Sequence, residues 1–282
     1  MDVLISPDAM RAWSATAHAA GHTVAVVPTM GALHAGHLAL IAAASERATR
    51  VVVTIFVNPL QFNQPTDFDK YPRPIDDDLT ACRLAGVAAV YAPTSAVMYP
   101  AGFQTHVEPG ELADRLEGPL RPGHFRGVTT VVTKLFAATR PDVALFGQKD
   151  YQQLAIVRQM VADLDLGIDI VGLATVREPD GLALSSRNLR LAPADRAAAV
   201  AIPRALGAAA AAHTDGQHDA HALQVIAASV LADEPLGTVE YVEVVHPATL
   251  EPVAATVEGA VILTAVWFGG VRLIDNRVLP PV

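Results

Sequence analysis

Cysteine, lysine and aromatic residues are scarce in this chain of 282 residues. The single cysteine, Cys82, excludes a disulfide framework and a cysteine-based zinc site. Only 5% of the residues are aromatic, and 20 basic residues face 29 acidic ones, which leaves a formal net charge of −9. Because nucleic-acid binding needs clustered Lys and Arg, this balance argues against nucleic acid as a partner.

Long hydrophobic runs are also missing, although 51% of the residues are hydrophobic. Alanine accounts for much of that fraction, and no window approaches the roughly 20 apolar residues of a membrane span. Residues 1–10 lack the basic start and the apolar stretch of a signal peptide. We therefore expect no membrane partner and a reducing, cytoplasmic setting.

Residues 1–175 alternate short β-rich runs with helical patterns. The strands are expected at residues 23–29, 50–57, 87–92, 142–147 and 169–175, and the helices at residues 37–48, 76–85, 128–138 and 150–163. The strand runs are apolar on both faces, as in parallel strands that helices cover on each side. The alternation predicts a doubly wound α/β sheet.

The character of the sequence changes near residue 176, which indicates a second, smaller domain. Alanine-rich helical patterns at residues 193–212 and 218–233 precede strand patterns at residues 238–245, 260–268 and 271–275. We expect an α+β domain over residues 176–282. At roughly 100–200 residues per domain, the chain is long enough for both domains.

The sharpest motif is PTMGALHAGH at residues 28–37, directly after the first strong strand. It leads from a strand end into a helix, where open α/β sheets bind ligands and unpaired backbone N–H groups attract phosphate. His34 and His37 lie three residues apart, and both can donate hydrogen bonds to phosphate oxygens. Either histidine alone is explained more simply as a loop cap, but the whole arrangement indicates a phosphate site.

Two further segments carry cations suited to the same kind of ligand. In FGQKDYQQ (residues 146–153), Lys149 follows a strand end, and Gln153 lies one helical turn later. In DGLALSSRN (residues 180–188), two serine hydroxyls precede Arg187, a combination that suits a polyphosphate. An ordinary interdomain turn is the alternative interpretation of the second segment.

Amides and acids lie between these segments. Asn58 and Gln61 follow the second strand, and their amides suit hydroxyl and carboxylate groups. Three aspartates at residues 76–78 either bind a divalent cation through water or open a helix whose dipole they complement; we favour the helix. The segment RPGHFRG (residues 121–127) either binds an anion or is a solvated loop.

Together these segments resemble a known family. HAGH resembles the HIGH motif of the nucleotidyltransferase superfamily. The ordered set PTMGALHAGH, FVNPLQF, YPR, GHFRGV, FGQKDYQQL and LSSRN is similar to the pantothenate synthetase (pantoate–β-alanine ligase) family over residues 23–276. The resemblance implies a Rossmann-like doubly wound parallel sheet that binds ATP and pantoate in residues 1–175. It also implies that residues 176–282 form a lid over the active site.

The resemblance further implies an activity. Family members condense (R)-pantoate with β-alanine at the expense of ATP, through an enzyme-bound pantoyl adenylate. The products are pantothenate, AMP and pyrophosphate, and the reaction serves pantothenate and coenzyme A biosynthesis. The resemblance implies Mg²⁺ as a cofactor and a homodimer as the assembly.

Individual residues are implied only where they match the family motifs. The residues expected to carry the chemistry, with His37 as proton donor, are His34, His37, Lys149 and Arg187. The expected ATP site comprises Met30, Gly31, Ala32, Leu33, His34, Ala35, Gly36, His37, Gly147, Gln148, Lys149, Asp150, Val176, Leu184, Ser185, Ser186 and Arg187. Pantoate and β-alanine are expected to contact Gln61, Gln153, Asn58 and Thr29. The Mg²⁺ ligands stay unassigned.

Three positions depart from the family pattern. Gln148 stands where Glu is usual, Leu184 stands where Met is usual, and the residues after Asn188 lack the usual tyrosine. We still expect activity, with an altered nucleotide affinity. Two alternatives stay open, namely an adenylyltransferase that acts on a nucleotide or phosphopantetheine, and a catalytically silent nucleotide-binding protein.

Overall fold

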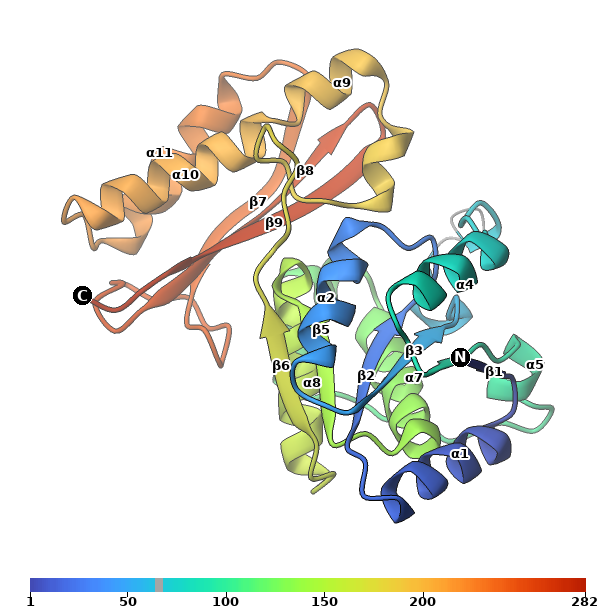
Figure 1. Cartoon of the computed structure of the whole chain (residues 1–282). Coiled ribbons are helices and arrows are strands. Elements are labelled where there is room, and N and C mark those ends of the chain that lie inside the picture. Colours follow the sequence, from blue (N-terminus) through green and yellow to red (C-terminus); the bar gives the residue numbers. More distant parts are fainter. Residues whose placement is uncertain (64–67) are drawn as a thin grey trace. The chain divides into compact units, whose positions relative to one another are not determined.

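The computed structural model describes residues 1–63 and 68–282 and divides into two compact units (Figure 1). The first unit comprises residues 1–148 and 156–174, and the second comprises residues 149–155 and 175–282. The helix α8 (Tyr151–Asp163) therefore begins in the second unit and continues in the first.

A six-stranded parallel sheet forms the centre of the first unit, in the order β1-β4-β3-β2-β5-β6. Its strands are β1 (Asp2–Leu4), β2 (Val24–Thr29), β3 (Arg50–Ile55), β4 (Ala89–Tyr91), β5 (Val143–Gly147) and β6 (Asp169–Leu173). From β2 the sheet grows through β3 and β4 on one side and through β5 and β6 on the other. This order confirms the doubly wound prediction.

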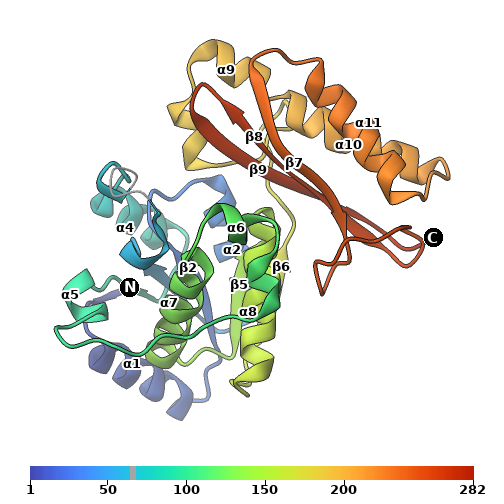
Figure 2. The same cartoon turned by 180° about the vertical axis from the view of Figure 1, so that it is seen from behind.

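Helices cover both faces of this sheet (Figures 1 and 2). One face carries α2 (Ala35–Ser45) and α4 (Ile75–Leu84), and the other carries α1 (Pro7–Ala19), α7 (His124–Thr139) and most of α8. The connections contain α5 (Ser95–Met98), α6 (Glu117–Leu120), and the 3-10 turns η1 (Pro59–Gln61), η2 (Glu111–Asp114) and η3 (Gln148–Asp150). Residues of β2 and β3 such as Val26 and Val52 are fully buried, which explains their apolar character on both faces.

Local chemistry sets where these helices begin. Helix α2 begins at Ala35, two residues before the expected start, because His34 caps it. Helix α7 begins at His124, four residues before the expected start, directly after Gly123, whose φ is +79°. Neither β1 nor α1 was predicted, although Ser6 caps α1 and Pro7 opens it, which together are a helix-start signal.

The second unit contains a three-stranded antiparallel sheet in the order β7-β8-β9. The strands are β7 (Gly237–Val245), β8 (Ala260–Phe268) and β9 (Val271–Leu279). The helices α10 (Ala201–Thr214) and α11 (Ala220–Ala232) share one hydrophobic core with this sheet, which includes Leu206, Leu223 and Phe268. The prediction of a C-terminal α+β structure is confirmed.

One predicted helix of the second unit is wrong in its extent. The pattern at residues 193–212 forms two helices, α9 (Pro193–Ala198) and α10, that are separated at Ala199 and Val200. Pro203 has no N–H to donate to the carbonyl of Ala199, four residues earlier, and its ring crowds that carbonyl. The helix therefore breaks one turn before the proline.

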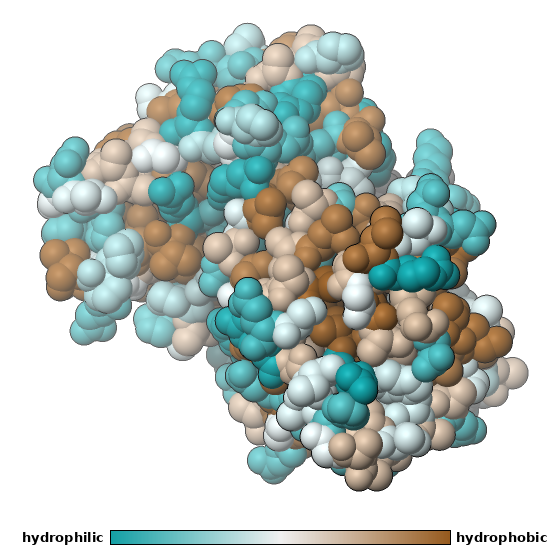
Figure 3. Space-filling model, viewed as in Figure 1, coloured by the Kyte–Doolittle hydropathy of each residue, from teal (hydrophilic) through white to brown (hydrophobic). Residues whose placement is uncertain are grey.

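Hydrophobic residues are not confined to the cores. On the face drawn in Figure 3 they gather over α2 of the first unit, where Leu38 is 41% exposed. None of the helices in residues 1–63 and 68–282 is long and apolar enough to cross a membrane.

Candidate active site

The loop of residues 30–34 leaves the carboxyl end of β2, the strand at which the sheet order switches direction. Ligands of open α/β sheets bind at such switch points. Gly31 has φ +81° and Ala32 has φ 52°, so the loop makes a tight left-handed turn. A Cβ atom on Gly31 would lie 2.8 Å from Asp78 Oδ2, which explains why this position needs glycine.

A buried carboxylate holds this loop in place. Asp78, in the first turn of α4, is 2% exposed, and its Oδ2 and Oδ1 atoms accept hydrogen bonds from Ala32 N at 2.8 Å and Leu33 N at 2.7 Å. The helix interpretation of the three aspartates is confirmed, but the role of Asp78 as a clamp on the loop was not predicted. The bonds connect residues 45 and 46 positions apart, a separation that no local pattern reports.

His34 and His37 form a capping box at the start of α2. His34 Nδ1 accepts a hydrogen bond from Gly36 N at 3.1 Å, and His37 Nδ1 accepts one from His34 N at 3.2 Å. Because Nδ1 is an acceptor in both rings, the hydrogen-bond network assigns the proton of each neutral ring to Nε2. The ring centroids lie 4.1 Å apart, so the two Nε2–H donors are neighbours at a helix N-terminus. The capping interpretation and the phosphate interpretation are therefore compatible.

Thr29, at the end of β2, also stabilises the loop of residues 30–34. Its hydroxyl donates to the carbonyl of Thr54 at 2.7 Å and accepts from Gly31 N at 3.1 Å. The side chain is 8% exposed. Thr29 thus supports the backbone of the loop through both of its hydroxyl bonds.

Gln61 lies beside the loop and is oriented by Asn58. Asn58 Nδ2 donates to Gln61 Oε1 at 3.0 Å and to the carbonyl of Gly127 at 3.0 Å, while Tyr99 OH donates to Asn58 Oδ1 at 2.7 Å. With Oε1 engaged, the Gln61 Nε2 group faces Met30 Sδ at 3.2 Å. Sulfur is a weak acceptor, so a strong donor is held beside the loop.

Two features around this amide were not predicted. Burial raises the pKa of Tyr99 far above its ordinary value of 10. The phenol therefore keeps its proton and donates to Asn58 at neutral and at moderately alkaline pH. In α7, Gly127 admits the η1 backbone: a Cβ atom there would lie 2.4 Å from the carbonyl oxygen of Leu60. His124 Nδ1 lies 2.9 Å from the carbonyl oxygen of Gln61, which joins the predicted GHFRG segment to the same network.

A cavity of about 280 Å³ opens beside Met30 and Gly31. Two of its polar lining groups already have backbone partners: Asp78 accepts from the loop amides, and Arg73 donates to the carbonyls of Phe68 and Tyr71. The cavity offers space next to the loop with few polar groups to bind a ligand.

Lys149 and Arg187 are the cations of interest in the second unit. Lys149 lies in η3 at the end of β5, and Arg187 lies in η4 (Ser186–Arg190), which Ser185 caps by accepting from Arg187 N at 3.2 Å. Among the residues that the structure describes, neither the Lys149 ammonium nor the Arg187 guanidinium makes an ion pair or a hydrogen bond. By contrast, Arg177 pairs with Asp275 and Arg196 with Glu178. Unpaired, half-buried cations suit an anionic ligand.

A narrow hairpin carries the segment that leads to Arg187. Leu184 N donates to the carbonyl of Val176 at 2.9 Å, and Glu178 N donates to the carbonyl of Leu182 at 2.8 Å. The hydrogen bonds of Arg196 and Asn188 lower the pKa of Glu178, which stays ionised near neutral pH. The predicted residues Val176 and Leu184 are thus brought into direct contact.

The structure brings some of the predicted site residues together within each unit. The first unit brings together Thr29, the loop with both histidines, Asn58 and Gln61 through the contacts above. The second unit brings together Val176 and the segment 184–187, and holds Lys149 through β9. Gln153 lies near the start of α8 and is half-buried, while Gly147, Gln148 and Asp150 flank Lys149 at the end of β5.

Comparison with known proteins gives a consistent result. The family model for pantoate-beta-alanine ligase matches residues 2–278. A pantothenate synthetase of Salinispora arenicola is 54% identical over 256 residues, which cover 90% of each chain.

Solved structures agree with that match. The pantothenate synthetase of Thermus thermophilus is 42% identical, covers all of both chains and has a TM-score of 0.94. A pantoate-beta-alanine ligase of Francisella tularensis, described as complexed with beta-gamma ATP and beta-alanine, is 33% identical over 99% of this chain and 97% of its own, with a TM-score of 0.80. The chain therefore belongs to the pantoate–β-alanine ligase family.

Proposed function

We propose that this chain catalyses the ATP-dependent condensation of (R)-pantoate with β-alanine, which yields pantothenate, AMP and pyrophosphate. Family membership supports the reaction. The contact that carries the assignment to a site is that of Gln61 Nε2 with Met30 Sδ. It brings a donor suited to a carboxylate against the loop that offers donors suited to phosphate.

The reaction proceeds in two steps. A carboxylate oxygen of pantoate attacks the α-phosphorus of ATP, the bond to the bridging oxygen breaks, and pyrophosphate leaves. The amine of β-alanine then attacks the acyl carbon of the pantoyl adenylate, the acyl C–O bond breaks, AMP leaves, and the nitrogen loses a proton. Since the adenylate is itself the activated acyl group, no protein nucleophile is needed. The protein places the substrates for attack and stabilises the charge that develops on the phosphates in the transition state.

The donors of the two units divide this work. The Nε2–H groups of His34 and His37 donate to phosphate oxygens at the N-terminus of α2, and His37 serves as the proton donor. Lys149 and Arg187 neutralise the charge that develops on the phosphates. The wider ATP site comprises residues 30–37, 147–150, Val176 and residues 184–187.

Pantoate is held by Gln61 and Gln153 and is supported by Asn58 and Thr29. The Gln61 Nε2 group donates to an oxygen of pantoate in place of the weak contact with Met30. We also assign the second unit the role of a lid during turnover. This assignment is supported by its two cations, Lys149 and Arg187, which have no counter-charge among the described residues.

Magnesium enters as part of the MgATP substrate in this proposal. No group of three or more His, Cys, Asp or Glu side chains suited to a metal occurs in residues 1–63 and 68–282. Both oxygens of Asp78 accept backbone hydrogen bonds. In this proposal phosphate oxygens and water, which usually supply most Mg²⁺ ligands in ATP sites, would hold the ion.

The assembly and the compartment are also part of the proposal. The family resemblance supports a homodimer that acts in the cytoplasm. Sedimentation velocity at micromolar concentration is expected to give twice the mass of the chain. A species with the mass of one chain would refute the dimer without affecting the proposed reaction.

The activity is tested by measuring AMP and pyrophosphate with each substrate omitted in turn. Steady-state release is expected only when ATP, pantoate and β-alanine are all present. A lack of pantoate-dependent AMP would refute the function and favour a catalytically silent nucleotide-binding protein, whereas turnover with a nucleotide or phosphopantetheine would favour another adenylyltransferase. His37→Ala and Lys149→Ala are each expected to lower kcat by at least ~10²-fold, as the loss of a transition-state charge contact does.

A further inference from the structure

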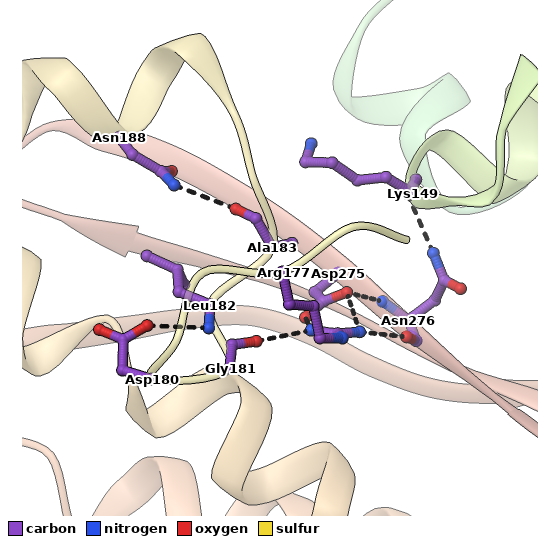
Figure 4. Close-up of polar contacts among 9 residues, drawn as sticks. All are labelled: Lys149, Arg177, Asp180, Gly181, Leu182, Ala183, Asn188, Asp275 and Asn276. Carbon is purple, nitrogen blue, oxygen red and sulfur yellow. Dashed lines mark hydrogen bonds and ion pairs between the residues drawn. The ribbon is translucent and has the colours of Figure 1, made fainter. Parts of the chain in front are cut away.

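Two adjacent residues of β9 are linked to the segments that carry Lys149 and Arg187 (Figure 4). Asn276 contacts Lys149 directly, and Asp275 binds Arg177, which contacts the turn before residues 184–187. Successive side chains of a strand point to opposite faces, so one residue pair can reach two different segments. Asp275 is 2% exposed and Asn276 is 5% exposed. The pair is therefore buried, and each of its polar groups has to be bonded within the fold.

Asn276 holds the backbone of Lys149. Its Nδ2 atom donates to the carbonyl oxygen of Lys149 at 2.9 Å, across 127 positions of sequence. Figure 4 shows this carbonyl directed at Asn276 while the Lys149 side chain extends away from it. The bond thus fixes the base of the side chain without contacting the ammonium group.

Asp275 holds the turn before the Leu184–Arg187 segment through Arg177. The Arg177 guanidinium binds the two carboxylate oxygens of Asp275 at 2.7 and 3.0 Å, and it donates to the carbonyl of Gly181 at 2.9 Å. Gly181 has φ +90° and lies in the turn that Asp180 closes by accepting from Leu182 N at 3.2 Å. The position of this turn therefore depends on β9.

The charges in this network have separate roles. Arg177 is neutralised by a buried carboxylate in a two-point ion pair, so its charge is committed within the fold. Lys149 and Arg187 have no such partner among the described residues. The network anchors the segments that carry these two cations and leaves their charges available for an anion.

We propose that Asn276 is a positioning residue for MgATP binding, which acts through Lys149 by fixing the Lys149 backbone. Asp275 and Arg177 hold the turn before residues 184–187 in the same network. This inference rests on the proposed function. A shift of about 1 Å in a group that positions a substrate can cost on the order of 10²-fold in rate, so one backbone bond at Lys149 has a measurable effect.

The test is a double-mutant cycle on ATP affinity, measured by calorimetry on the full chain without pantoate. Asn276→Ala and the uncharged Asn276→Leu, which is close to Asn in shape, both remove the donor to Lys149. Each is expected to raise the Kd of MgATP by about tenfold in the wild-type background. In the Lys149→Ala background, the same substitutions are expected to change the Kd by less than twofold, because the group through which Asn276 acts is missing.

The matched control is Thr256→Val. Thr256 precedes β8 in the same unit, is fully buried, and its hydroxyl oxygen lies 3.0 Å from His213 Nδ1, so the control removes a similar buried bond at a residue that is not paired with Asp275 or Asn276. It is expected to leave the Kd of MgATP within twofold of wild type. Arg177 is not used for the test, because its removal would leave the Asp275 carboxylate buried without its counter-charge and threaten folding.

Three outcomes overturn the proposal. The first is an equal effect of Asn276→Ala in both backgrounds, and the second is an effect of Thr256→Val as large as that of Asn276→Ala. The third is an unchanged Kd in folded Asn276→Ala and Asn276→Leu. Each can occur while the wild-type protein still forms AMP from ATP in a pantoate-dependent reaction, so failure of this inference is distinguishable from failure of the proposed function.

Discussion

Gly127→Ala tests the packing that places Gln61. In α7 a Cβ atom at position 127 would lie 2.4 Å from the carbonyl oxygen of Leu60 and 2.8 Å from Gln61 N. Ordinary contact begins at 3.4 Å, so η1 has to retreat by about 1 Å. The retreat also strains the bond from Asn58 to the carbonyl of Gly127. Overpacking of this kind costs roughly 1–3 kcal/mol, and a misplacement of about 1 Å costs on the order of 10²-fold in rate.

The assay for Gly127→Ala combines steady-state kinetics with thermal unfolding. We expect kcat/KM for pantoate to fall by about 10²-fold, a smaller change in kcat/KM for ATP, and a lower Tm. Gly207→Ala is the matched control, because Gly207 lies within α10 and a Cβ atom there has no neighbour within 4 Å. That variant is expected to stabilise the protein by up to about 1 kcal/mol and to leave the kinetics unchanged. Wild-type kcat/KM for pantoate in folded Gly127→Ala would refute the reasoning.

Three further predictions concern buried side chains. Asp78→Asn replaces one acceptor oxygen by a donor, so either Ala32 N or Leu33 N loses its hydrogen-bond partner. We expect kcat to fall about tenfold. An unchanged kcat would contradict the role of Asp78 as a clamp on the loop. Tyr99→Phe is expected to raise the pantoate KM about fivefold, whereas the control Tyr91→Phe, which loses only a 3.8 Å contact with sulfur, is expected to leave that KM unchanged; equal effects would refute the orientation of the Asn58 amide. Burial and then the Asp78 charge raise the pKa of Cys82 to about 11, against 9.0 for the unfolded thiol. Between pH 9 and 11 the folded state therefore binds more protons than the unfolded state. Relative to Cys82→Ala, the free energy of unfolding is expected to fall by up to ~1.4 kcal/mol per pH unit over this range. Parallel curves of unfolding free energy against pH for the two proteins would contradict this.

The parts of the fold that follow from local chemistry were predictable from the sequence. Within the apolar run at residues 23–29, the four successive residues Val24–Val27 are fully buried, so the run itself indicates a strand of a parallel sheet that is covered on both faces. The loop with His34 and His37 was predictable because strand, turn and helix follow one another directly. The break before Pro203 was also within reach, since the rule that a proline frees the carbonyl four residues earlier applies to the sequence alone.

The parts that depend on single long-range bonds were not predictable. Asp78 contacts the loop 46 positions away, Tyr99 contacts Asn58 across 41 positions, and Asn276 contacts Lys149 across 127 positions. None of these side chains forms part of a periodic pattern or a turn signal. Each of these side chains positions a predicted site residue or loop through a tertiary contact, and local sequence does not encode that contact.

The most direct test of the adenylate mechanism follows oxygen atoms. Pantoate labelled with ¹⁸O in its carboxylate is converted with ATP and β-alanine, and the products are analysed by mass spectrometry. If the carboxylate attacks the α-phosphorus and the acyl C–O bond then breaks, each AMP carries one ¹⁸O and the pyrophosphate carries none. Unlabelled AMP, or ¹⁸O in pyrophosphate or in inorganic phosphate, would contradict the account.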